Sequence, residues 1–189
     1  EIQMLLCHVL GLPRSWLIGH DRDVLPESTV QAYSALLTRR LVGEPIAYIV
    51  GGREFFGLEF LTTPAVLIPR PETELLLELA LARIPVNQPC RVLDLGTGSG
   101  AIAISLAKNR PLAELVAVDQ SQAALSVARE NAARLQAPNL RLQQSNWFSA
   151  LADKVFDLIV SNPPYVEAAD PHLQQGDVRF EPLSALASG

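Results

Sequence analysis

Hydrophobic residues in the first third of the chain recur at steps of three and four, the spacing of an amphipathic helix. Residues 2–10 form one such stretch, and Gly11, which follows it, is a residue on which helices commonly end. A longer stretch begins near residues 26–28 and stops at Gly43. We therefore expect a small N-terminal helical domain over residues 1–46.

Two strand-like runs rich in β-branched and aromatic residues follow this domain. They span residues 47–50 and 54–61, with two adjacent glycines between them. Runs of this kind on either side of a glycine pair are typical of a β-hairpin. We predict a hairpin linker over residues 47–63 and a further domain over residues 64–189.

From residue 64 onward, helical and strand-like stretches alternate. Short apolar strands are expected at residues 91–95, 115–119, 140–143 and 156–161. Helices are expected at residues 71–84, 101–108 and 123–135. This alternation predicts an α/β fold, a doubly wound parallel sheet with helices on both faces.

Composition narrows the class of protein. Of the 189 residues, 49% are hydrophobic and 19% are charged, and the mean hydropathy is +0.20. No apolar run approaches the roughly 18 residues that a membrane helix needs. Cys7 and Cys90 are far apart in the sequence, and no residues show the spacing of a metal site. We expect a cytoplasmic globular protein without membrane contact and without a bound metal.

The charge of the chain disfavours nucleic acid as a partner. The net charge is −5 at pH 7, and the isoelectric point is near 5.2. The only prominent basic pair is Arg39-Arg40, whereas nucleic-acid-binding domains usually carry a basic face. We therefore expect no direct binding of nucleic acid.

A glycine-rich turn follows the first strand of the predicted sheet. It reads Asp94-Leu95-Gly96-Thr97-Gly98-Ser99-Gly100-Ala101. Open α/β sheets bind ligands at such strand-to-helix junctions, and glycine lets the backbone approach a cofactor closely. The same glycines satisfy the dinucleotide fingerprint, so they do not separate a nicotinamide cofactor from S-adenosylmethionine.

Two acidic residues frame this turn. Asp119 ends the next strand, where its carboxylate can accept hydrogen bonds from both ribose hydroxyls of either cofactor. Asp94 directly precedes the turn. A carboxylate there would repel a pyrophosphate but attract the cationic amino-acid end of S-adenosylmethionine. The pair therefore favours the methyl donor.

A stiff turn, Asn162-Pro163-Pro164-Tyr165, follows the fourth predicted strand. The prolines fix their own φ angles, donate no N–H and hold Asn162 extended. The side-chain carbonyl of Asn162 and the backbone carbonyl of Pro163 can each accept one N–H of a planar NH₂ group, and Tyr165 offers a flat packing face. Such a turn suits methylation of a conjugated nitrogen, for which orientation contributes ~7–11 kcal/mol at best.

These residues resemble the Asn-Pro-Pro-Tyr class of S-adenosylmethionine-dependent methyltransferases, and most closely the protein-(glutamine-N5) methyltransferases of peptide-chain release factors. The resemblance also covers residues 43–48, 53–58, 67–74 and 180–182. It implies a Rossmann-like class I methyltransferase fold whose N-terminal helical domain helps hold the release factor. A class I sheet has seven strands and four are predicted, so we expect C-terminal strands to be missing and the family to extend before Glu1.

The resemblance also implies the reaction and the roles of residues. A methyl group would pass from S-adenosyl-L-methionine to the glutamine of the Gly-Gly-Gln loop of a release factor, leaving S-adenosyl-L-homocysteine. The donor would be bound by Asp94, Gly96, Thr97, Gly98, Ser99, Gly100, Asp119, Asn146, Trp147 and Asn162. The glutamine amide would be held by Asn162, Pro163, Pro164 and Tyr165, with Asn162, Pro163 and Tyr165 as the catalytic set and Leu67 and Arg70 in the pocket wall.

Several alternatives stay open at this point. Asn146 stands where the family more often has aspartate, Trp147 could instead belong to the core, and residues 67–70 could be a packing loop between domains. The same Asn-Pro-Pro-Tyr turn could hold the amino group of adenine N6 or guanine N2 in a nucleic-acid methyltransferase. A non-catalytic cofactor-binding module is the other alternative, which the intact turn disfavours.

Overall fold

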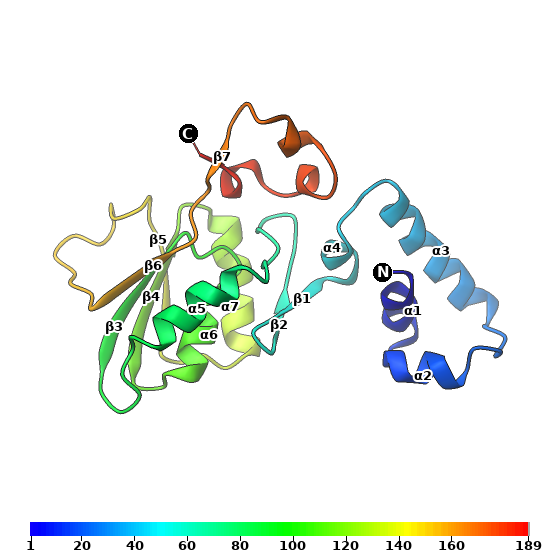
Figure 1. Cartoon of the computed structure of the whole chain (residues 1–189), viewed down its shortest axis with the longest axis horizontal. Coiled ribbons are helices and arrows are strands. Elements are labelled where there is room, and N and C mark those ends of the chain that lie inside the picture. The colour runs from blue at the N-terminus through cyan, green and yellow to red at the C-terminus, as the bar shows by residue number, and fades with distance from the viewer. Residues whose placement is uncertain (189) are drawn as a thin grey trace. The chain divides into compact units, whose positions relative to one another are not determined.

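The computed structural model describes residues 1–188, and Gly189, the last residue of the predicted second domain, lies outside the described residues. The chain divides into two compact units, Glu1–Gly51 and Gly52–Gly189. Figure 1 draws the first in blue to cyan and the second in cyan to red. The division falls inside the segment that the sequence predicts as a hairpin linker.

The first unit consists of helices. They are α1 (Ile2–Leu10), α2 (Arg14–Gly19), α3 (Glu27–Leu41) and α4 (Ile46–Val50). Gly11 ends α1 in the left-handed region at φ 66°, the conformation that glycine adopts at no steric cost. Helix α1 contacts each of the other three helices, and its Leu5 is fully buried. It is therefore the central helix of this unit.

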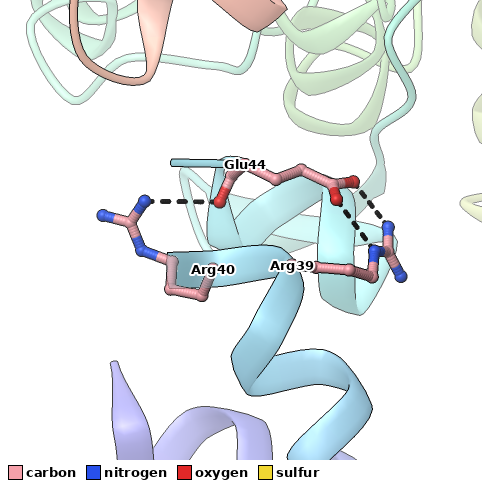
Figure 2. A network of polar contacts seen from close by, with 3 residues as sticks. All are labelled: Arg39, Arg40 and Glu44. Carbon is pink, nitrogen blue, oxygen red and sulfur yellow. Dashed lines mark hydrogen bonds and ion pairs between the residues drawn. The ribbon is translucent and has the colours of Figure 1, made fainter. Parts of the chain in front are cut away.

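Carboxylates engage the basic pair at the end of α3. The Glu44 carboxylate accepts hydrogen bonds from Nε (2.8 Å) and Nη2 (2.5 Å) of Arg39, and its backbone carbonyl accepts one from Nη1 of Arg40 at 3.3 Å (Figure 2). Nε of Arg40 also donates to the Glu1 carboxylate at 2.8 Å. Because both guanidinium groups have acidic partners, this pair does not form a free basic patch.

The strand predicted for residues 47–50 is wrong, because these residues form helix α4. The carbonyl of Pro45 accepts hydrogen bonds from the amides of Tyr48 (3.0 Å) and Ile49 (3.1 Å), which close the first helical turn. Gly51 ends the helix in the left-handed region at φ 76°. Tyr48 and Ile49 are buried, and burial overrides the strand preference of β-branched and aromatic residues.

The hairpin lies slightly later along the chain. It consists of β1 (Gly52–Phe55) and β2 (Leu58–Leu61), which pair antiparallel. Phe56 and Gly57 connect them with φ angles of 50° and 74°, as a two-residue type I′ turn requires. The amide of Phe56 donates to Oε1 of Glu74 at 3.0 Å. That bond holds an unusual backbone conformation for a phenylalanine.

A four-stranded parallel sheet forms the centre of the second unit and confirms the predicted α/β fold. Its strands, in spatial order, are β5 (Leu140–Gln144), β4 (Ala113–Asp119), β3 (Cys90–Leu95) and β6 (Leu158–Ser161). In β3, Asp94 lies opposite Ala117 of β4 on one side and Val160 of β6 on the other. Because the strands run in the same direction, the turns that follow them meet at one edge of the sheet.

Helices lie on one side of this sheet, as Figure 1 shows. They are α5 (Thr73–Leu81), α6 (Ala101–Asn109) and α7 (Gln122–Arg134). Leu77 of α5 and Ile104 of α6 belong to the larger core cluster, against which Ala132 of α7 packs. On the opposite face, Leu93 packs with Leu151, from the irregular segment between β5 and β6. Helices were predicted on both faces, but among residues 1–188 the second face packs against Leu151 and Phe156 of this irregular segment instead of a helix.

Short elements follow β6. They are β7 (Val166–Glu167), η1 (Pro171–Gln174), η2 (Val178–Phe180), η3 (Leu183–Ala185) and β8 (Ala187–Ser188). Strands β7 and β8 pair in parallel, with Val166 opposite Ala187. The chain therefore returns to the region just after β6, beside the Asn-Pro-Pro-Tyr turn.

Candidate functional site

A cleft opens in the second unit at the edge of the sheet where β3, β4 and β6 end. It encloses about 1030 Å³, counting space that is continuous with solvent. The predicted site residues that line it are Leu67, Arg70, Gly96, Thr97, Gly98, Ser99, Asp119, Asn146, Trp147, Asn162 and Pro164. Segments far apart in the sequence thus form one site.

Four predicted site residues are not part of the cleft wall. Asp94 and Gly100 are buried, whereas Pro163 is exposed and Tyr165 is 79% exposed. Gly100 has φ 83°, and a Cβ atom there would lie 2.7 Å from Cδ1 of Ile104. Its place in the turn is thus explained by packing against α6. The roles predicted for Pro163 and Tyr165 toward a substrate stay predictions.

The glycine turn is folded against the end of β4. The amides of Gly96 and Thr97 both donate to the carbonyl of Val118, at 2.9 and 3.0 Å. The next amide, that of Gly98, donates to Oδ2 of Asp119 at 2.9 Å. Gly96 and Gly98 have φ angles of 73° and 55°, a region that glycine enters without strain. The turn is therefore held in place by the end of β4, and its other side faces the cleft.

Asp119 connects the glycine turn with the start of α7. Its Oδ2 accepts the amide of Gly98, and its Oδ1 accepts the amide of Ser121 at 2.9 Å. The Ser121 hydroxyl in turn caps α7 by accepting the amide of Ala124 at 3.2 Å. The carboxylate is therefore fixed in the cleft wall, and each of its oxygens keeps further capacity to accept a hydrogen bond.

Asp94 lies beneath the turn rather than in the cleft wall. The residue is 1% exposed, and neither carboxylate oxygen has a hydrogen-bond partner of normal geometry. The pKa of Asp94 is raised to about 7, mainly by burial and in smaller part by the negative charge of Asp119, while the nearby Thr97 hydroxyl and Ala103 amide favour the ionised form and oppose the rise. Asp94 is thus a buried acid that titrates near neutral pH.

This burial predicts a pH dependence of stability. The folded protein holds the Asp94 proton up to about pH 7, whereas the unfolded chain releases it near 3.8. Between these values the folded state binds more protons, so the free energy of unfolding falls as pH rises, by about 1.4 kcal/mol for each full pKa unit. Urea denaturation should find the protein less stable at about pH 8 than at about pH 5 because of this group.

The matched variant is Asp94→Asn, which keeps the size of the side chain and removes its titration. Its free energy of unfolding should depend less on pH over this range than that of the unmodified protein. Equal slopes for the two proteins would show that Asp94 does not carry the effect.

Asn162 is oriented by a residue from the start of α5. Its Nδ2 donates to the hydroxyl of Thr73 at 3.3 Å. The preceding residue, Ser161, donates from its hydroxyl to the carbonyl of Leu95 at 2.9 Å, which ties the end of β6 to the end of β3. With Nδ2 engaged, Oδ1 of Asn162 is the group left to accept a hydrogen bond in the cleft.

Trp147 is held at the cleft by the residue two positions before it. Its backbone is in the left-handed region at φ 49°, which is rare outside glycine and is concentrated at functional sites. The hydroxyl of buried Ser145 donates to the Trp147 carbonyl at 2.7 Å and accepts the amide of Ala150 at 3.0 Å. Trp147 is 50% exposed, so it is not a core tryptophan.

Asn131 of α7 joins the hairpin to the glycine turn. Its side chain is buried, and its Oδ1 accepts the amide of Leu61 at 2.8 Å. Its Nδ2 donates to the carbonyls of Leu61 (3.1 Å) and Ser99 (2.9 Å). One amide group therefore fixes the end of β2 and one residue of the cleft wall.

Sequence reasoning missed Thr73, Ser145 and Asn131. Thr73 belongs to residues 67–74, which resemble the family. Nothing in the sequence predicts its hydrogen bond with Asn162, which lies 89 positions away. A serine between a strand and an exposed aromatic residue is a typical turn signal, and it could have indicated Ser145. Asn131 stands in an alanine-rich helix with no local signal of its role.

Residues 1–188 contain no group of three or more His, Cys, Asp or Glu side chains placed to hold a metal ion. None of the helices in this part of the chain combines the length and apolar character that crossing a membrane requires.

The chain is similar to known methyltransferases. Family models match residues 71–177 (Methyltransferase small domain) and residues 1–51 (PrmC N-terminal domain). The release factor glutamine methyltransferase of Escherichia coli (strain K12) is 54% identical over 188 residues, which are 100% of this chain and 68% of that protein. The protein of the same name from Bordetella pertussis is 54% identical over 187 residues, 98% of this chain and 69% of that protein. Among solved structures, a methyltransferase from Pyrococcus furiosus matches with a TM-score of 0.49 and 25% identity, covering 70% of this chain and 63% of that one.

Proposed function

The chain belongs to the release factor glutamine methyltransferase family, and we propose that its cleft is where the methyl group is transferred. It methylates a release factor glutamine with S-adenosylmethionine as the donor. One observation carries the assignment of the site: the glycine turn, Asp119 and Asn162 line a single cleft.

The half of the cleft beside β4 fits the donor. Backbone of the glycine turn lies on one side, and the fixed carboxylate of Asp119 can accept hydrogen bonds from ribose hydroxyls. Trp147, half exposed on the wall, offers an apolar face for the adenine. S-adenosylmethionine supplies the electrophilic methyl group.

The half of the cleft around Asn162 suits the glutamine amide. Because Thr73 engages Nδ2 of Asn162, Oδ1 is available to accept one N–H of the substrate amide. The backbone carbonyl of Pro163 would accept the other, as the stiffness of the two prolines allows. With both N–H groups held, the nitrogen lone pair is directed at the methyl carbon, and orientation is the main contribution the protein makes to the rate.

The transfer balances without a metal or an oxidant. The amide nitrogen forms a bond to the methyl carbon while the bond from that carbon to sulfur breaks, and S-adenosylhomocysteine leaves as a neutral thioether. The nitrogen, now cationic, gives up one of its two protons to solvent. The product is an N5-methylated glutamine.

The experiment that tests this function is mass spectrometry of a release factor after incubation with the chain and S-adenosylmethionine. We expect one added methyl group on the glutamine of the Gly-Gly-Gln loop. A release factor with that glutamine replaced by alanine is the matched control and should gain none. Label on nucleic acid alone would support the base methyltransferase instead, and label on neither substrate would support a non-catalytic module.

The first unit, residues 1–51, is the part that we expect to help hold the release factor, and we expect no direct binding of nucleic acid. Both guanidinium groups of the Arg39-Arg40 pair are engaged by carboxylates. The basic surface that a base methyltransferase would use for its polyanionic substrate is therefore not supplied by this pair.

A further inference from the structure

Glu181 is a buried carboxylate that holds two distant segments of the chain. It lies between η2 and η3, and its side chain is 0% exposed. Its Oε2 accepts the amide of Ile68 at 3.0 Å, and its Oε1 accepts a hydrogen bond from Nη2 of Arg70. Each oxygen thus binds a different group of the segment that precedes α5.

Both of the segments that Glu181 joins are part of the cleft. Leu67, Pro69 and Arg70 line it on one side of the contact, and Pro182 and Ser184 line it on the other. Apart from Asn162, which follows β6, the residues predicted to bind the donor belong to β3, to the end of β4 and to the turns after β3 and β5. Glu181 therefore sets the position of wall segments on the side of the cleft away from the glycine turn.

The first two residues of α5, which follow this segment directly along the chain, make two further connections to distant parts of the second unit. Thr73 accepts the hydrogen bond from Asn162, and Glu74 accepts one from the amide of Phe56 in the hairpin turn. The polar side chains at residues 70, 73 and 74 thus reach three separate pieces of the second unit. Displacing residues 67–70 would move the wall of the cleft. It would also shift Thr73, which orients the side chain of Asn162.

We propose that Glu181 is a positioning residue for the glutamine substrate and that Arg70 acts through Glu181 rather than by contacting the substrate. The inference rests on the proposed function of the cleft. It changes the role predicted for Arg70, whose guanidinium is engaged by the buried carboxylate. The side chain of the substrate glutamine is uncharged and gives a guanidinium no ionic partner.

The Glu181→Gln variant cannot keep both contacts of the carboxylate. An amide has one acceptor oxygen and one NH₂ group, so it can accept from Ile68 or from Arg70 with that oxygen but presents a donor to the other. Removing one partner of a buried ion pair also leaves the remaining charge uncompensated. Either Glu181→Gln or Arg70→Gln should therefore release the wall segment while leaving the donor residues in place.

The test is a double-mutant cycle with Arg70→Gln, Glu181→Gln and the two combined. Each single variant should lower kcat on the release factor by roughly 100-fold, the cost of a small displacement of the reacting groups. Because Arg70 acts through Glu181, the double variant should lose no more than Glu181→Gln alone. The Kd for S-adenosylhomocysteine, measured by calorimetry, should not change, and Arg70→Lys should recover most of kcat because it keeps the charge.

Asp157→Asn is a control for the loss of a carboxylate-to-amide contact at an exposed side chain elsewhere in the second unit. Oδ2 of Asp157 accepts the amide of Arg91 at 2.7 Å, which is also a carboxylate-to-amide contact, but it lies at the start of β3, away from the cleft. This variant should keep both kcat and donor binding. A loss of kcat as large as that of Glu181→Gln would mean that general destabilisation explains both.

Two results would overturn the inference. If Glu181→Gln keeps kcat, Glu181 does not position the wall. If the two losses of kcat multiply in the double variant, Arg70 acts independently of Glu181. Should Glu181→Gln fail to fold, Arg70→Gln and Arg70→Lys decide the matter, because equal losses in these two contradict a role through the ion pair. Absence of methylation by the unmodified chain would instead refute the proposed function.

Discussion

Replacing Asn162 with alanine is expected to reduce kcat for release factor methylation by at least roughly 100-fold, because the amide nitrogen loses the group that orients it. Donor binding should be largely kept, since the glycine turn and Asp119 belong to other strands and make their own contacts. Single-turnover assays with labelled donor would measure the rate, and calorimetry with S-adenosylhomocysteine would measure the affinity. Turnover equal to that of the unmodified chain would refute the role assigned to Asn162.

Thr73 provides a graded control for this experiment. Thr73→Val keeps the shape of the side chain and removes the hydroxyl that accepts from Nδ2 of Asn162. It should reduce kcat by less than Asn162→Ala, because Oδ1 of Asn162 remains. Thr73→Ser keeps the hydroxyl and should behave almost as the unmodified protein. A larger effect of Thr73→Val than of Asn162→Ala would point to a separate role of Thr73.

Asp119→Ala is expected to raise the Kd for S-adenosylmethionine by at least roughly 100-fold, because hydrogen bonds to a charged group contribute about 1.5–3 kcal/mol each and ribose offers two donors. Part of this loss comes from the turn itself, whose Gly98 amide also depends on Asp119. Asp119→Asn keeps the size of the side chain and one acceptor oxygen, but it removes the charge and presents an NH₂ group to one of the two amides that Asp119 binds. Calorimetry would measure both variants, and an unchanged Kd for Asp119→Ala would place the ribose elsewhere.

The sheet and its helices could be predicted from the sequence because their signal is local. Buried parallel strands are continuous apolar runs, and helices of the right length lie between them. The prediction was wrong at residues 47–50, where strand-forming residues adopt a helix. There the apolar character reports burial, and only the hydrogen bonds to the Pro45 carbonyl decide between a helix and a strand.

The cleft was predictable where its residues form continuous motifs. The glycine turn and the Asn-Pro-Pro-Tyr turn each carry their backbone restrictions in adjacent residues, so their chemistry can be deduced without a structure. The contacts that support them could not be deduced. Asn131 lies 70 positions from Leu61 and Arg70 lies 111 positions from Glu181 along the sequence. Only the folded structure brings residues so far apart in the sequence into contact.

Asn131 has a consequence for how the second unit unfolds. Toward Leu61 its side chain both accepts and donates, as a neighbouring peptide group in a sheet would. Its second N–H is bound to Ser99 in the glycine turn. The hairpin and the donor turn therefore share one buried amide, and opening either of them leaves a polar atom of Asn131 without its partner. We expect local unfolding of one segment to weaken the other through this side chain.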